Sequence, residues 1–336
     1  MKKRRTIIVC ICILAAAAFT LALALPKKSY AAIGRNARKH YVEYETRHSD
    51  PQDEPAKDED DDSSEFWFPV PEGYLNKKTD EKKYVSSINP DDTPEQWDAL
   101  EDAVQMREVS QIPADILETV STDELVLYCM NYNLFIDFML FDTMQDGMEN
   151  VRSDYNGIRE LMTRPDAAES LIRLYKLYDL DEQKARDSVG CIRLRYLEAM
   201  LCMPEILNSL TAKQANELAA ACAQKISKIV NDENSPYSVS ATMYLAAVSQ
   251  YAASEEFAEI VNASSGAKRY IEEGILVPDE ISDDTLGRIV SYFQELYFFD
   301  INLFSTFIYR IKKGSPHKLC GNPFSFQFRL KRISRH

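Results

Sequence analysis

The sequence predicts an all-α protein, arranged as an irregular multi-helix bundle or a helical-repeat-like array of about ten short helices. Three observations predict it. Apolar residues recur at spacings of three and four, helix-capping patterns recur, and prolines separate the periodic stretches. No repeat of fixed length with a residue signature is found, so a regular solenoid is not predicted. We expect one all-helical domain over residues 93–313.

Residues 1–32 predict a signal peptide or an N-terminal membrane anchor. A basic start precedes an uncharged apolar run over residues 6–25, and the small residues Ser29 and Ala31 follow. Signal peptidase requires small side chains at such positions, whereas the run also approaches the ~20 apolar residues that span a bilayer. Cleavage and retention both stay open. In either case the positive start places the rest of the chain outside the cytoplasm, so we expect a secreted or envelope-anchored protein that meets the membrane only through this segment.

The chain is acidic, with 53 Asp and Glu against 39 Lys and Arg and a formal net charge of -14. Such a chain repels phosphate backbones, because nucleic-acid affinity depends on Lys and Arg neutralising phosphates. We therefore expect no nucleic-acid partner, and an envelope protein or a glycan instead. The acidity is expected to serve solubility outside the cell. The oligomeric state stays open.

Residues 33–92 predict an acidic disordered linker. Acidic residues are dense there, including the run at 58–62, and aliphatic residues are few, so burial cannot offset the entropy of ordering. The acidic run lacks the glycine of an EF-hand loop, which favours a solvated spacer over a Ca²⁺ site. The aromatic and proline-rich patch at 66–71 is expected to dock onto the protein's own domain rather than onto a partner.

Helix signals begin at residue 93, where Thr-Pro-Glu-Gln combines a capping hydroxyl with a proline at the first helical position. Further capping patterns and one-sided apolar stripes follow along the chain. The predicted capping pairs are Ser121 with Glu124, Asp166 with Glu169, and Thr211 with Gln214. The predicted buried stripes are Leu171, Leu174, Tyr175 and Tyr178, and Leu218, Cys222, Ile226 and Ile229.

The cysteines beyond the signal are odd in number and fall at apolar helical positions. In a chain long enough to build a core without disulfides, this pattern predicts buried thiols. One disulfide within the group 191, 202 and 222 stays open. The cysteines are Cys129, Cys191, Cys202, Cys222 and Cys320.

Residues 109–178 carry three motifs: Ile-Pro at 112–113, Ser-Thr-x-x-Leu from Ser121, and Asn-Gly-x-x-Glu-Leu-x-x-Arg-x-Asp from Asn156. In these motifs the segment resembles an uncharacterised family of exported all-helical proteins from anaerobic gut bacteria. The resemblance implies an extracytoplasmic helical domain. It brings no catalytic residue with it.

Physically the same segment is expected to be scaffold, with Ser121 as a helix cap, Gly157 allowing a close helix approach or a bend, and Arg164 pairing with Asp154 or Glu160. The functional alternative gathers four carboxylates around one cleft as acid and base. Sequence spacing cannot bring carboxylates of different helices together, so the structural role is favoured. The four acids are Asp137, Asp142, Asp154 and Glu160.

All histidines lie outside the predicted helical domain, at His40, His48, His317 and His336. This excludes Ser-His-Asp and Cys-His hydrolases and His-ligated zinc sites from the domain. No glycine-rich nucleotide-binding motif occurs either. We therefore predict no catalytic residue, cofactor-binding residue or metal ligand. A non-catalytic binding or scaffolding domain at the cell surface is preferred. The alternative is a carboxylate-dependent cell-wall or glycan hydrolase, which needs no histidine.

The C-terminal part holds the most aromatic stretch, residues 289–311. Polar residues such as Glu295 and Asp300 within it make membrane spanning costly, so it is expected to be a central helix covered on most sides by its neighbours. Residues 314–336 predict a basic aromatic tail that is poorly ordered, although alternating phenylalanines at 324, 326 and 328 resemble one face of a strand.

Overall fold

The computed structural model describes residues 68–76, 81–141, 143–181, 188–232, 235–274 and 280–297. This part of the chain is all-helical and contains no strand, which confirms the predicted class. Ten of its helices have seven residues or more. The signal segment, the acidic run and the C-terminal tail lie outside the described residues, and the predictions made for them stay predictions.

The described residues belong to two compact units. The smaller one comprises residues 88–109, with α3 (Pro94–Asp98) and α4 (Ala103–Val109). Helix α3 begins at Pro94 as predicted, but the Thr93 hydroxyl does not cap it. Thr93 Oγ1 instead accepts from the backbone N–H of Asn89 at 2.9 Å and donates to the Asn89 carbonyl at 3.0 Å. The Thr93 hydroxyl therefore forms its hydrogen bonds within the preceding turn rather than at the start of α3, where the sequence predicted it.

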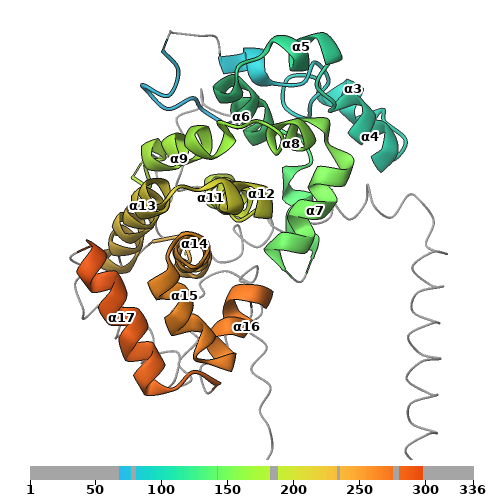
Figure 1. Ribbon diagram of the computed structural model, residues 1–336. Coiled ribbons are helices and arrows are strands. Elements are labelled where there is room, and N and C mark those ends of the chain that lie inside the picture. Colours follow the sequence, from blue (N-terminus) through green and yellow to red (C-terminus); the bar gives the residue numbers. More distant parts are fainter. Residues whose placement is uncertain are drawn as a thin grey trace, which may run out of the picture. The chain divides into compact units, whose positions relative to one another are not determined.

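The larger unit contains all other described helices. In chain order they are η1 (Glu81–Tyr84), α5 (Ala114–Thr119), α6 (Thr122–Met130), η2 (Phe135–Leu140), α7 (Met144–Asp154), α8 (Asn156–Leu161), α9 (Ala167–Leu177), α11 (Ser188–Leu201), α12 (Pro204–Ser209), α13 (Ala212–Asn231), α14 (Val239–Ala253), α15 (Glu255–Asn262), α16 (Ser265–Glu273) and α17 (Asp283–Tyr297). Helices α13 and α14 form the most extensive pairing, α11 packs on α9 and α14, and α15 joins α14 to α16 and α17 (Figure 1).

The core of this unit follows the predicted apolar stripes. All four residues of the α13 stripe are buried, as are all four of the stripe that runs along α9 and ends just beyond it. Helix α14 is buried along most of its length, from Val239 to Gln250, because α11, α12, α13, α15 and α16 all pack against it. The stripes could be predicted because a helix that buries one face has apolar residues at intervals of three and four in the sequence.

Two of the three later capping predictions are confirmed. Ser121 and Thr211 each form a complete capping box with the residue three positions on. The pair of Asp166 with Glu169 is wrong, since Asp166 makes no capping bond. Its carboxylate accepts from Thr122 Oγ1 at 2.6 Å and so joins the start of α9 to the start of α6.

The described cysteines are buried free thiols, as predicted, and the open disulfide within the group 191, 202 and 222 does not form. Burial raises the pKa of the Cys129, Cys202 and Cys222 thiols. Cys320 lies outside the described residues.

Helix α17 reaches into the aromatic stretch as far as Tyr297. The rest of the stretch lies outside the described residues, so the expectation of a helix covered on most sides stays a prediction. Tyr292 and Phe293 are buried against the unit, whereas Ser291 and Glu295 are exposed. Among the described helices, its main contacts are with α15 and α13. Among the described residues no helix has both the length and the apolar character needed to cross a membrane.

Candidate functional site

The acids considered for catalysis take scaffold positions where the structure describes them. Glu160 in α8 accepts from Arg164 Nε at 2.7 Å, one of the two pairings expected. The same guanidinium donates to the carbonyls of Leu117 at 2.9 Å and Val120 at 3.3 Å, at the C-terminal end of α5. Arg164 therefore satisfies carbonyls that the end of a helix leaves without partners.

The other two described acids of that group belong to elements other than α8. Asp137 lies in η2, and Asp154 ends α7, where its backbone carbonyl accepts from Gln111 Nε2 at 2.9 Å. Asp142 lies outside the described residues. Gly157 does serve a close approach, but to a ring rather than to another helix. A Cβ at this position would lie 2.5 Å from the Tyr155 ring.

The stretch before residue 88, predicted as linker, contributes to the core of the larger unit. We call residues 68–76 and 81–87 the N-terminal strap. Three of its aromatic side chains, Phe68, Tyr74 and Tyr84, are almost fully buried. The expected docking of the aromatic patch onto its own domain is confirmed for Phe68, whose ring stacks on Tyr178 with centroids 5.9 Å apart. Its backbone N–H donates to Asn131 Oδ1.

The middle of the strap is held by Tyr74. Its hydroxyl lies 3.1 Å from Ser170 Oγ, and the Arg173 guanidinium lies 5.3 Å from the centre of its ring. Arg173 also pairs with Asp123 of α6. Tyr74 therefore packs where α6 and α9 meet, in an arrangement that no spacing in the sequence reveals.

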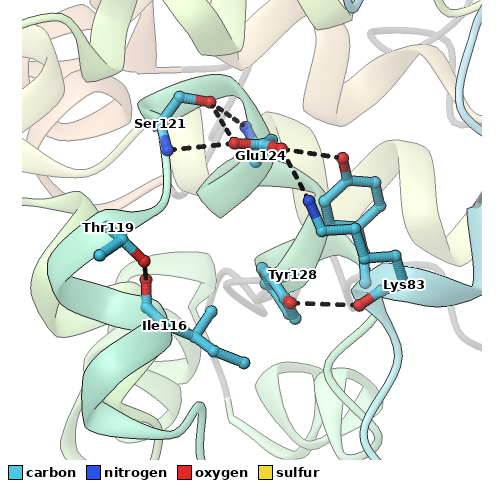
Figure 2. A network of polar contacts seen from close by, with 7 residues as sticks. Lys83, Ile116, Thr119, Ser121, Glu124 and Tyr128 are labelled. Atoms are coloured by element: carbon cyan, nitrogen blue, oxygen red, sulfur yellow. Dashed lines mark hydrogen bonds and ion pairs between the residues drawn. The ribbon is translucent and has the colours of Figure 1, made fainter. Parts of the chain in front are cut away.

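The end of the strap meets α6 at Glu124 (Figure 2). Glu124 Oε2 accepts from the Ser121 backbone at 3.3 Å and from its hydroxyl at 2.8 Å, which completes the capping box. Glu124 Oε1 accepts from Lys83 Nζ at 3.1 Å and from Tyr84 Oη at 3.3 Å. Tyr128 adds a bond from its hydroxyl to the Lys83 carbonyl at 3.1 Å. Partial burial raises the pKa of Glu124, but the bonds from Ser121 and Lys83 outweigh it and lower the pKa to about 2.

A second polar cluster lies inside the unit around Glu198 of α11, which is 1% exposed. Its Oε1 accepts from Tyr175 Oη of α9 at 3.0 Å and from Thr242 Oγ1 of α14 at 2.6 Å. Lys225 of α13 places its ammonium 4.9 Å from the centre of the Tyr175 ring and donates to the Tyr178 carbonyl. Burial raises the pKa of Glu198 to about 7 and lowers that of Lys225 to about 8.

A groove with a volume of about 520 Å³ lies between α15 and α17. The buried Ile260 and Tyr292 form part of its lining, and Gly287 leaves open space beside α17. Five acidic residues and a single arginine make up most of the rest, namely Glu256, Glu259, Asp283, Asp284, Glu295 and Arg288. We call this surface the acidic groove.

The chemistry of the acidic groove is that of a binding surface for positive charge. None of the three acids considered from the sequence that the structure describes, Asp137, Asp154 and Glu160, lines it. Within the described part of the chain, no group of three or more His, Cys, Asp or Glu residues is arranged to hold a metal ion. Sequence reasoning missed the groove because α15 and α17 are separate helices, although the density of acidic residues in each was visible.

Comparison with known proteins gives no match: no protein-family model fits the chain, and no significant similarity is found to curated proteins or to solved structures. The resemblance of residues 109–178 to exported helical proteins thus stays a prediction.

Proposed function

We propose that the chain is a non-catalytic binding domain, secreted or anchored at the bacterial cell surface, and that its acidic groove binds a basic segment of an envelope protein. The observation that carries this proposal is the groove itself. It places exposed carboxylates of two helices, α15 and α17, along one groove, so a partner can place lysines or arginines beside these acids.

Three of the five groove acids, Glu256, Glu259 and Glu295, are available for a partner. In the described part of the chain, Glu256 and Glu259 of α15 and Glu295 of α17 are exposed and make no ion pair. Acids elsewhere in the unit, such as Glu160 and Glu124, are instead engaged by arginine or lysine within the scaffold. A partner that brings positive charge to these three acids would therefore break no ion pair within the described part of the chain.

Binding to isolated cell envelopes tests the proposal. The purified chain would be sedimented with envelopes, and the bound fraction measured against salt concentration. We expect Glu256→Gln with Glu259→Gln to weaken binding at least tenfold, and added salt to weaken wild-type binding because it screens exposed charges. The matched control changes Glu118 and Glu169 to glutamine, since these are also exposed acids that form no ion pair with a described residue but lie on α5 and α9. Equal loss in both double variants would refute the groove as the binding surface.

The glycan-hydrolase alternative predicts turnover, so a second assay separates the two proposals. Release of soluble fragments from cell-wall glycan would be compared for wild type and Glu160→Gln. Glu160 is held by Arg164 rather than placed in the acidic groove, which favours the binding proposal. Fragment release by wild type that the substitution abolishes would support the hydrolase and contradict the non-catalytic proposal.

A further inference from the structure

In the interior of the larger unit, the carboxyl group of Glu198 lies in a polar cluster with side chains from three neighbouring helices. Glu198 on α11 accepts hydrogen bonds from Tyr175 on α9 and Thr242 on α14. The Tyr175 ring also lies against the ammonium of Lys225 on α13. A single tyrosine thus stands between a buried acid and a buried base. In the described part of the chain the two charged groups make no direct ion pair, since the Lys225 ammonium donates to the Tyr178 carbonyl.

Such an arrangement is costly when both groups are ionised. Transferring a carboxylate or an ammonium from water to the protein interior costs several kcal/mol for each group. Only a direct ion pair with good geometry offsets most of this desolvation cost. Two neutral hydroxyl donors compensate a carboxylate less well than charged donors do. Thr242 and Tyr175 can also donate hydrogen bonds to a neutral carboxyl group, whose burial costs far less free energy than that of a carboxylate.

The other titratable groups facing Glu198 do not remove this cost. Cys222 of α13 and Cys202 of α11 are buried thiols that stay neutral, and α14 contributes Thr242, which does not titrate. Arg195 of α11 favours the ionised carboxylate, but less than burial disfavours it. Among the charged groups on the other elements that pack against α11, Asp123 of α6 pairs with Arg173, and Arg152 of α7 pairs with Glu205 of α12.

We propose that Glu198 makes the packing of α9, α11, α13 and α14 proton-linked, so that the larger unit becomes more stable as the surrounding pH falls from neutral to acidic. The folded state takes up a proton at Glu198 that the unfolded chain does not hold. Stability from this proton is complete below pH 4.5, the ordinary pKa of the group, and is lost as the pH rises through about 7.

Lys225 changes the stability of the larger unit with pH in the opposite direction. Its folded pKa of about 8 lies below the ordinary value of 10.5, so its contribution is present above pH 10.5 and is lost as the pH falls through about 8. The two groups together give least stability between about pH 7 and 8. A protein outside the cytoplasm meets the pH of its surroundings, and this core would respond to it.

Urea unfolding of the full chain from pH 4.5 to 8.5 tests the proposal, with wild type compared with Glu198→Gln. Glutamine keeps the shape of the side chain and removes the titration. We expect the ratio of the two unfolding constants to change roughly hundredfold across this range, because one proton is linked over about two pH units. Parallel profiles for the two proteins would overturn the proposal.

A second variant keeps the test decisive if Glu198→Gln does not fold. Tyr175→Phe removes one donor to the ionised carboxylate, so the window in which stability is lost should move to higher pH. The control is Tyr251→Phe, which removes a hydroxyl bonded to Asn262 on the surface and should leave the window in place. An unmoved window in Tyr175→Phe, or the same shift in the control, would count against Glu198 as the linked group.

Discussion

Glu124 links the capping box of α6 to the N-terminal strap, so Glu124→Ala should cost more than a single cap or a single surface bond. Loss of the capping interaction with Ser121 costs about 1 kcal/mol. Loss of the hydrogen bond from Tyr84, whose ring is buried, costs about another 1 kcal/mol. The pair with Lys83 adds less than about 1 kcal/mol, because the lysine side chain is 53% exposed. We therefore expect the free energy of unfolding to fall by about 2 to 3 kcal/mol, measured by urea denaturation.

The two halves of this interaction can be separated. Ser121→Ala should remove the cap alone and Tyr84→Phe the strap bond alone, each for about 1 kcal/mol, and hydrogen exchange of residues 81–87 should accelerate in Tyr84→Phe but not in Ser121→Ala. The carboxylate stabilises above pH 4.5 and this stability is lost as the pH falls through about 2, so the acid sensitivity of wild type should weaken in Glu124→Ala. A cost below 0.5 kcal/mol for Glu124→Ala, within the range of ordinary surface changes, would refute the reasoning.

Three further predictions concern the core. Gly147→Ala should lower the free energy of unfolding by about 2 kcal/mol or more, because its Cβ would lie 2.0 Å from the Phe138 carbonyl oxygen. Gly287→Ala should instead raise the free energy of unfolding by up to about 1 kcal/mol, because its Cβ would meet open space. Urea denaturation measures both effects. Phe68→Ala should cost about 3 kcal/mol by the same assay and free the strap for proteolysis, since the ring is 2% exposed and stacks on Tyr178; an undigested strap would contradict its docking. The four described cysteines should resist a thiol reagent until the chain unfolds, because all four are buried away from it; fast labelling of the native protein would contradict this.

Local signals in the sequence predicted local structure. The capping boxes at Ser121 and Thr211 and the stripe along α13 depend on residues three or four apart, and all three predictions are confirmed. The prediction for Asp166 failed because a residue from another helix, Thr122, competes for its carboxylate. The same competition occurs at Thr93, whose hydroxyl bonds within the preceding turn.

Features that depend on tertiary contacts were not predictable. Tyr74 and Tyr84 lie in a stretch whose composition resembles a linker, and only partners on α6 and α9 make their burial favourable. In the sequence, nothing distinguishes Glu198 from other acidic residues of helices. Its burial depends on side chains from three neighbouring helices. The acidic groove likewise needs two helices that the sequence cannot orient relative to each other.

The central claim, that the acidic groove binds a basic segment of an envelope partner, is tested most directly by photocrosslinking. A photoreactive amino acid would replace Ser291, an exposed residue of α17 in the groove, and in a parallel protein Glu169, an exposed residue of α9. After illumination on cell envelopes, the account predicts a crosslink from position 291 to a peptide rich in lysine or arginine, suppressed by salt and absent from position 169. Crosslinks of equal yield from both positions, or none from position 291 while the protein is bound, would contradict it.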